Sequence, residues 1–304
     1  MQLGDWQLTT VNGGMFRLDG GVMFGVVPKS LWHNVVRADP QNRVPFANHC
    51  VLARNGVHNV LIDTGYGGKY DALQRKFYDM EEGEPLIRSL AELQMPLDQI
   101  DTVLFSHLHF DHVGGATRLD AGGARRLTFP QARHVVGRIE WEDATREAIE
   151  LKTAYALEDI LPLRHAQLDL VEDGQQILPG LKAILTGGHT RGHLAFLFES
   201  GGQAAIYLAD ICPSTAHLRH MWCPAYDTHP LDSRRRKPQL LGQVADGRWW
   251  VLWNHDPRLA ASRIRRHPQR EFVACDGLPR LGGTTDTWLS DKRQSNPNHQ
   301  RKFC

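Results

Sequence analysis

The chain has 304 residues and a net charge of +1 with histidine neutral; 41% of its residues are apolar and 23% are charged. This composition is typical of a globular protein with a sizeable core, and the near-zero charge excludes a strong field that would recruit nucleic acid or anionic lipid. No apolar run is long enough for a membrane span, and the first ten residues, MQLGDWQLTT, do not resemble a secretory leader. The five cysteines are scattered and form no CxxC pair, so we expect free thiols and a cytoplasmic location.

Short apolar runs separated by glycine and asparagine turns open the chain. They predict strands over residues 6–11, 22–27 and 57–62. Residues 84–95 carry apolar side chains at helical spacing, and residues 102–105 form a further short strand.

The second half of the chain mixes the same two kinds of element. Helices are predicted over 139–160 and 231–245, the latter capped by Asp232 or Ser233, and strands over 182–185, 194–198, 204–208 and 249–253. Mixed strands and helices indicate α/β or α+β architecture. The polar composition after about residue 282 predicts one catalytic domain over 1–281, followed by a tail over 282–304 that is loosely packed or disordered.

The segment VLFSHLHFDHVGG, residues 103–115, places four ionisable side chains directly after an apolar strand. Side chains at i and i+2 of an extended segment point the same way, so His107 and His109 can reach one metal ion together. Asp111 and His112 follow as the chain turns and can face a second ion. Imidazole and carboxylate both suit zinc. Four ionisable groups within six residues are costly beside a core unless they are used.

Three more apolar runs end in a potential ligand. AILTGGH ends in His189, AAIYLAD in Asp210 and WWVLWNH in His255. A single histidine at a strand end is usually an ordinary structural residue, but neighbouring strand ends meet in a sheet, so these three side chains could converge on the motif. The hypothesis is a di-metal site in which His107, His109 and His189 hold one ion. Asp111, His112 and His255 would hold the other, with Asp210 as the bridge.

The ordered set HLHFDH, GG, GGHTRGH, LAD and NHD resembles the metallo-β-lactamase superfamily, and VLIDTG at 60–65 resembles the strand before its first ligand loop. The resemblance implies a four-layered αββα sandwich with the metals at one edge between the sheets. It also implies two divalent ions per chain; we expect zinc, with iron, cobalt or manganese as alternatives. Asp63 matches the family's buried aspartate, which orients an imidazole. His193 is expected to tie its loop by hydrogen bonding.

Two residues depart from the family pattern. Arg191 stands where GHTPGH has proline, so it either loosens the turn or faces the substrate. Many lactonases of this family carry a tyrosine three residues after the bridging aspartate, where this chain has Pro213. Either another group such as Tyr226 replaces that tyrosine, or the substrate is not a homoserine lactone.

The expected chemistry is hydrolysis by a hydroxide that the two ions generate at neutral pH, with Asp111 orienting the nucleophile and passing its proton and Asp210 bridging the ions. Within the superfamily the chain resembles the branch of N-acyl-homoserine lactonases and organophosphate hydrolases. We therefore expect lactone or ester hydrolysis, including quorum quenching; phosphotriesterase activity is the alternative, and an iron redox protein of the flavodiiron type is a distant one.

An apolar pocket for an acyl chain is expected from the segments near residues 22–32 and 221–226. The alternative is that these residues are core or dimer interface. The predicted partners are a small-molecule substrate and, as an open interpretation, a second copy of the chain, with no nucleic acid and no membrane. The pocket residues are Met23, Phe24, Val26, Val27, Leu31, Trp32, Met221, Trp222 and Tyr226.

Overall fold

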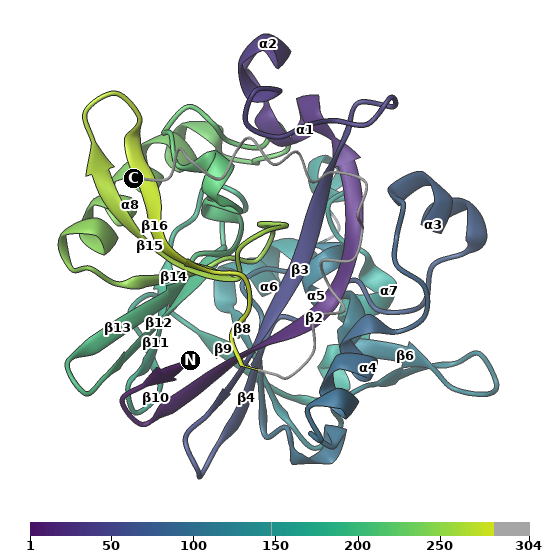
Figure 1. Ribbon diagram of the computed structural model, residues 1–304. Helices are drawn as coiled ribbons and strands as arrows, with labels where there is room; N and C mark the ends of the chain where they lie inside the picture. Colours follow the sequence, from purple (N-terminus) through teal and green to yellow (C-terminus); the bar gives the residue numbers. More distant parts are fainter. Residues whose placement is uncertain (147, 283–304) are drawn as a thin grey trace.

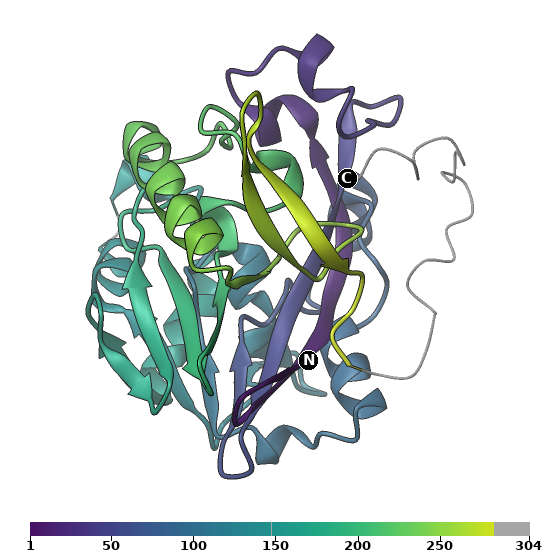
Figure 2. The same ribbon diagram turned by 60° about the vertical axis from the view of Figure 1, so that its left-hand side comes forward.

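A computed structural model describes residues 1–146 and 148–282 of the chain, so the predicted tail over 282–304 lies outside the described residues except for Gly282. Two seven-stranded sheets face each other, and helices cover their outer faces (Figures 1 and 2). This arrangement confirms the predicted αββα sandwich. Within the described ranges, no helix combines the length and the apolar character needed to cross a bilayer.

The strands of each sheet come from one half of the chain. The first sheet has the order β1 (Gln2–Leu3), β2 (Trp6–Asp19), β3 (Arg43–Arg54), β4 (Asn59–Ile62), β5 (Thr102–Leu104), β8 (Arg133–Gly137) and β9 (Gln167–Val171). The second has the order β10 (Gln176–Leu178), β11 (Leu181–Leu185), β12 (Leu194–Ser200), β13 (Gln203–Tyr207), β14 (Trp250–Leu252), β15 (Ala261–His267) and β16 (Glu271–Leu278). A separate hairpin joins β6 (Thr117–Leu119) to β7 (Arg125–Leu127).

Three buried apolar clusters hold these layers together. The first lies between the sheets, the second lies between the first sheet and its helices, and the third lies between the second sheet and α8. Figure 2 shows α8 lying over the second sheet. The helices are α1 (Gly20–Phe24), α2 (Lys29–Trp32), α3 (Ala72–Tyr78), α4 (Pro85–Glu92), α5 (Phe110–Val113), α6 (Arg138–Thr145), α7 (Leu157–Ile160) and α8 (Pro230–Asp246).

Parallel pairing inside the two sheets brings the important strand ends together. β4 pairs in parallel with β5, and β13 pairs in parallel with β14. The carboxyl ends of parallel neighbours meet at the same edge of a sheet. The residues that follow these four strands therefore lie at one edge of the sandwich, together with the loop after β11.

Most predicted elements are present, but three predictions were wrong. Residues 22–27 are not a strand: Asp19 caps α1 there, because its carboxylate accepts the backbone N–H groups of Gly21 and Val22 at 2.7 and 3.1 Å. The predicted helix over 139–160 is broken into α6, a single turn and α7; Ile149 is 86% exposed, so the apolar pattern does not follow one buried face.

The third wrong prediction concerns the start of α8. The helix begins at Pro230 after His229, and Pro238 lies within it, whereas Asp232 and Ser233 lie inside the helix and not at its cap. Proline suits a first helical position because its missing N–H would have no partner there.

We expect Phe198→Ala to destabilise the fold by about 3–5 kcal/mol, because it opens a cavity between the sheets. Phe198 on β12 is fully buried, and its ring lies edge-on to Trp6 of β2 with centroids 5.3 Å apart. Urea unfolding followed by tryptophan fluorescence measures the change. Val57→Ala is the control, because Val57 is 80% exposed, and it should leave the unfolding midpoint unchanged. Equal midpoints for the two variants would contradict this assignment of the core.

Candidate metal centre

Three imidazoles converge from the loops after β5 and β11. His107 Nε2 and His189 Nε2 each lie 3.0 Å from His109 Nδ1. The ligand atoms of all three residues fall within 4.8 Å of one another, and all three side chains are buried. This spacing would suit three ligands around a single ion, and the Nδ1 atom of His109 faces the other two imidazoles.

A second group forms beside the first from α5 and the loop after β14. Asp111 Oδ2 lies 3.4 Å from His255 Nε2 and 3.8 Å from His112 Nε2. The ligand atoms of these three residues also lie within 4.8 Å of one another, and all three side chains are buried. The two groups correspond to the two ligand sets expected from the sequence.

Asp210 joins the two groups. Its Oδ2 lies 3.3 Å from His189 Nε2 in the first group, and its Oδ1 lies 3.5 Å from His112 Nε2 and 3.1 Å from His255 Nε2 in the second. One carboxylate oxygen thus faces each group, which is the geometry a bridging ligand needs. Asp210 is 2% exposed, so water does not compete for this position.

The donor set fits a pair of divalent cations. His112 Nε2 is buried and has no hydrogen-bond partner within the described residues, although it points at the carboxylates of the two groups. A buried polar atom without a partner costs free energy, and a coordinate bond would remove that cost. Five imidazoles and two carboxylates are ligands that suit zinc.

The buried side chains of the centre have strongly shifted pKa values. Burial lowers the pKa of His107 and His109 well below the usual value, and their imidazole neighbours lower it further. Burial alone would also lower the pKa of His112, but the carboxylates of Asp111, Asp63 and Asp210 raise it well above its usual value. Burial would raise the pKa of Asp210, but the surrounding imidazoles hold it well below its ordinary range. Two of these imidazoles are thus strongly disfavoured as cations, and neutral imidazole is the metal-binding form.

Asp63, after β4, organises the motif from behind. Its Oδ2 lies 2.8 Å from His112 Nδ1 and accepts hydrogen bonds from Ser106 Oγ and Tyr207 at 2.8 and 2.9 Å, while Oδ1 accepts the backbone N–H of Ser106. These bonds orient the His112 ring with Nε2 toward the centre, as the resemblance implied. Asp63 has a φ of 54°, a left-handed conformation that is strained for a non-glycine residue.

His193 and Asn254 hold Asp210 in place. The backbone N–H of Asp210 donates to His193 Nε2 at 3.0 Å, and His193 Nδ1 lies 2.6 Å from Thr186 Oγ1. The amide of Asn254 donates to Asp210 Oδ1. His193 is absent from the groups of candidate ligands formed by the described residues, in keeping with a role in tying its loop.

Sequence reasoning missed several partners of the proposed ligands. Asp227 Oδ1 lies 2.8 Å from His189 Nδ1, and the carbonyl of Ala47 accepts a hydrogen bond from His255 Nδ1 at 2.7 Å. Asn254 directly precedes His255 in the WNHD run and was a detectable candidate. Asp227 is 38 residues from His189 in the chain and carried no local signal.

Arg191 neither loosens its turn nor faces the centre, because its side chain binds Asp143. Its guanidinium makes a two-point hydrogen bond to Asp143 of α6, with Nε at 2.7 Å and the terminal nitrogen at 2.8 Å. Such paired bonds fix the relative orientation of the two side chains. The interaction therefore anchors the His189 loop to α6, where the family pattern has a proline.

The residues expected to form an acyl pocket divide into buried and exposed sets. Phe24 and Trp32 are each 1% exposed; their rings stack with centroids 5.2 Å apart, inside an aromatic and aliphatic cluster that also contains Met23, Val27 and Trp222. The exposed set on the same segments is Val26, Leu31 and Met221, at 64, 54 and 38% exposure. α1 and α2 project from one end of the sandwich (Figure 1).

Tyr226 is the aromatic residue of this set that contacts the centre. Its ring centroid lies 5.3 Å from that of His189 and 6.2 Å from that of His109. The side chain is half-buried, and its hydroxyl is 3.4 Å from the thioether sulfur of Met23. A thioether is a weak acceptor, so this hydroxyl is available to a stronger one.

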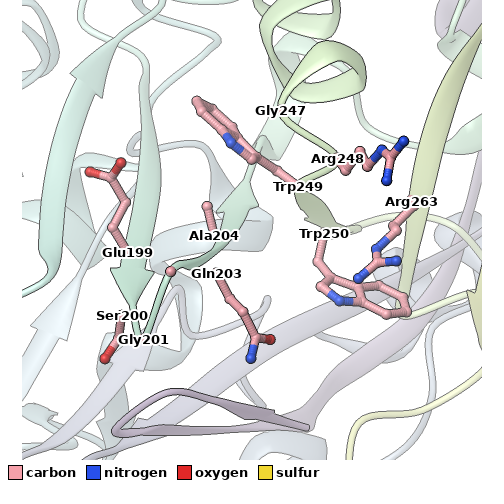
Figure 3. Close-up of a pocket in the computed structure, with 11 residues that line it drawn as sticks. Glu199, Ser200, Gly201, Gln203, Ala204, Gly247, Arg248, Trp249, Trp250 and Arg263 are labelled. Atoms are coloured by element: carbon pink, nitrogen blue, oxygen red, sulfur yellow. The ribbon is translucent and has the colours of Figure 1, made fainter.

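A separate cavity of about 650 Å³ lies at the opposite ends of β12 and β13, between their turn and the α8–β14 connection (Figure 3). Trp249, Trp250, Arg248 and Arg263 line one part of it and Glu199 another. None of the grouped histidines and aspartates lines this cavity. It is therefore distinct from the candidate centre.

The fold and the site place the protein in the class of metal-dependent hydrolases, because two facing sheets bring histidines and aspartates together at their strand ends. A model of the metallo-beta-lactamase superfamily matches residues 43–237. The chain belongs to this superfamily. The match covers Asp63 and every proposed ligand except His255, which follows β14.

Individual relatives agree with this assignment. A probable metal-dependent hydrolase from Staphylococcus aureus is 32% identical and has a TM-score of 0.81, over 91% of this chain and 100% of that chain. AidC, a dizinc quorum-quenching lactonase, has a TM-score of 0.73 at 21% identity over 90% of this chain and 95% of its own, which shows the shared fold.

Curated relatives match over a shorter region. An N-acyl homoserine lactonase from Bacillus thuringiensis is 29% identical over 129 residues, which is 42% of this chain and 45% of that protein. A hydroxyacylglutathione hydrolase from Aeromonas hydrophila subsp. hydrophila is 28% identical over 152 residues, 49% of this chain and 42% of its own. The chain spans about half the length of the curated relatives it matches.

We expect Asp210→Asn to lose at least one of two bound metal ions, because an amide cannot supply an anionic oxygen to each ion. Elemental analysis of zinc-saturated wild type should find close to two ions per chain. Asp246→Asn is the control, since Asp246 is exposed on α8 and pairs with Arg266 at the surface. Two tightly held ions in Asp210→Asn would remove Asp210 from the centre, and a single ion in the wild type would contradict the paired arrangement.

Proposed function

We propose that the protein is a di-metal hydrolase that opens lactones or cleaves related carboxylic esters, with N-acyl homoserine lactones as the leading substrate class. The proposal rests mainly on the position of Asp210. One of its oxygens faces the three-histidine group, and the other faces the Asp111–His112–His255 group. Two divalent ions held there would generate hydroxide near neutral pH and polarise the substrate carbonyl.

In this proposal Asp111 handles the proton of the attacking water. It is 7% exposed and lies at the edge of its group, 3.4 Å from His255 Nε2. A carboxylate in this position can accept a proton from the nucleophile and return it to the departing alkoxide oxygen. The chain then needs no serine or cysteine nucleophile, in keeping with the absence of a GxSxG motif.

In this proposal Tyr226 binds the substrate carbonyl oxygen. Burial, together with the carboxylates of Asp210 and Asp111, raises the pKa of this phenol well above its usual value, so the hydroxyl remains protonated and can donate at neutral pH. It stands beside His189 and His109, on the three-histidine side of the centre. In this proposal Tyr226 serves in place of the tyrosine that the family pattern would put at Pro213.

The lactone assignment draws its support from the relatives. Several curated relatives are N-acyl homoserine lactonases, although they match less than two thirds of their own length. The cluster around Phe16, Phe24 and Phe46 extends to His255, which contacts the Phe16 and Phe46 rings at centroid distances of 6.0 and 5.5 Å. These three phenylalanines are at most 3% exposed, so they give the centre apolar surroundings, and the acyl-chain proposal itself rests on the relatives.

A substrate panel on zinc-loaded protein tests the proposal. We expect hydrolysis of N-acyl homoserine lactones and aryl esters, with kcat/KM rising with acyl length by up to about fourfold per methylene, since each buried methylene contributes about 0.8 kcal/mol. The panel should include phosphotriesters and S-acyl glutathione, with chelator-treated protein as the blank. Turnover of phosphotriesters alone, or of thioesters alone, would replace the lactone assignment.

Tyr226→Phe should lower kcat/KM for the best lactone roughly 100- to 1000-fold, the usual effect of removing one donor to a developing oxyanion. The fall should lie mainly in kcat, because the bond strengthens as negative charge develops on the oxygen. Zinc content and thermal midpoint serve as controls and should match the wild type, since the ring itself is retained. A variant with wild-type kcat would show that Tyr226 does not contact the reacting carbonyl.

A further inference from the structure

The two loops that supply the three-histidine group are joined through one carboxylate on α6. Glu140 is fully buried; its Oε1 accepts the backbone N–H of Leu108 at 2.9 Å, and its Oε2 accepts the hydroxyl of Thr190 at 2.6 Å. Leu108 lies between His107 and His109, and Thr190 directly follows His189. A single side chain thus holds both ligand loops by atoms adjacent to the ligands.

The backbone around this contact is closely packed. A Cβ on Gly192 would come within 2.1 Å of the backbone nitrogen of Glu140, so the loop after His189 rests directly on the first turn of α6. Tyr155 adds a hydrogen bond to Glu140, and its ring centroid is 5.8 Å from that of His109. The loop after His189 therefore packs on α6, and Tyr155 links Glu140 of that helix to His109.

A fully buried carboxylate is costly unless its oxygens are used. Glu140 is not a member of the candidate ligand groups found among the described residues, so coordination does not explain its burial. Its two hydrogen bonds to the ligand loops do explain it, and they span 32 and 50 residues of chain. The position in the first turn of α6 also favours a negative side chain.

We propose that Glu140 is a positioning residue that sets the separation of the His107–His109 pair from His189 and thereby tunes metal affinity at the three-histidine position. The inference rests on the di-metal centre of the proposed function, but its test needs no hydrolysis. The two hydrogen bonds of Glu140 are made beside His107, His109 and His189, so the position of the Asp111–His112–His255 group should be affected much less.

The test compares zinc affinity by chelator competition and the visible spectrum of cobalt-substituted protein in four variants. Glu140→Ala should weaken one of the two zinc sites by about 10- to 100-fold, leave the other unchanged, and alter the cobalt spectrum of the weakened site. Thr190→Val should give a smaller change of the same kind. Glu142→Ala is the matched control, because Glu142 is exposed on the same helix and should behave as wild type.

Glu140→Gln separates positioning from charge. Its amide oxygen can still accept from Leu108 and its amide nitrogen can donate to Thr190 Oγ1, so near-wild-type affinity is expected. Wild-type affinity in both Glu140→Ala and Thr190→Val would overturn the inference, as would a loss in Glu140→Gln equal to that in Glu140→Ala. If Glu140→Ala does not fold, Thr190→Val and Glu140→Gln decide the matter. A wild type that binds no metal pair would instead overturn the proposed function, on which this inference rests.

Discussion

Asp210 lies within 3.5 Å of three imidazole nitrogens that come from three different loops, and it is almost completely shielded from water. A carboxylate in such a place is stable only if opposite charge or hydrogen bonds surround it. The carboxyl end of β13 puts it there, and the preceding Ala209 adopts a left-handed φ of 47° to turn the chain. Displacing this one side chain would separate the two groups of ligands, so the rest of the site depends on it.

Each of the two sheets supplies part of this centre. The first sheet supplies Asp63 and the HxHxDH motif after β4 and β5, while the second supplies His189, Asp210 and His255 after β11, β13 and β14. The centre therefore exists only when the sheets pack together, and packing between the sheets comes from apolar side chains such as Trp6 and Phe198. This arrangement couples the integrity of the hydrophobic core to the geometry of the site.

A layer of hydrogen-bond partners surrounds the proposed ligands and fixes their orientation. Asp63, Asp227 and the Ala47 carbonyl each engage the Nδ1 atom of one histidine, which leaves Nε2 facing the centre. Second partners of this kind raise ligand basicity and hold the ring. Two carboxylates of α6 hold the loops that carry the proposed ligands. Glu140 binds Leu108 and Thr190, and Asp143 binds Arg191.

The amino-acid sequence by itself determined the candidate ligand set and, through the family resemblance, the αββα fold, because the HxHxDH spacing and the proposed ligands at strand ends are local patterns. Only the tertiary structure decided the partners of those ligands. Asp227 and Glu140 lie tens of residues from the groups they bind, and no periodicity links residues so far apart. It likewise decided that Phe24 and Trp32 are buried, whereas the helix over residues 20–24 begins at a local cap, Asp19, that the sequence analysis did not recognise. Burial depends on what packs above a segment, and local sequence does not specify that neighbour.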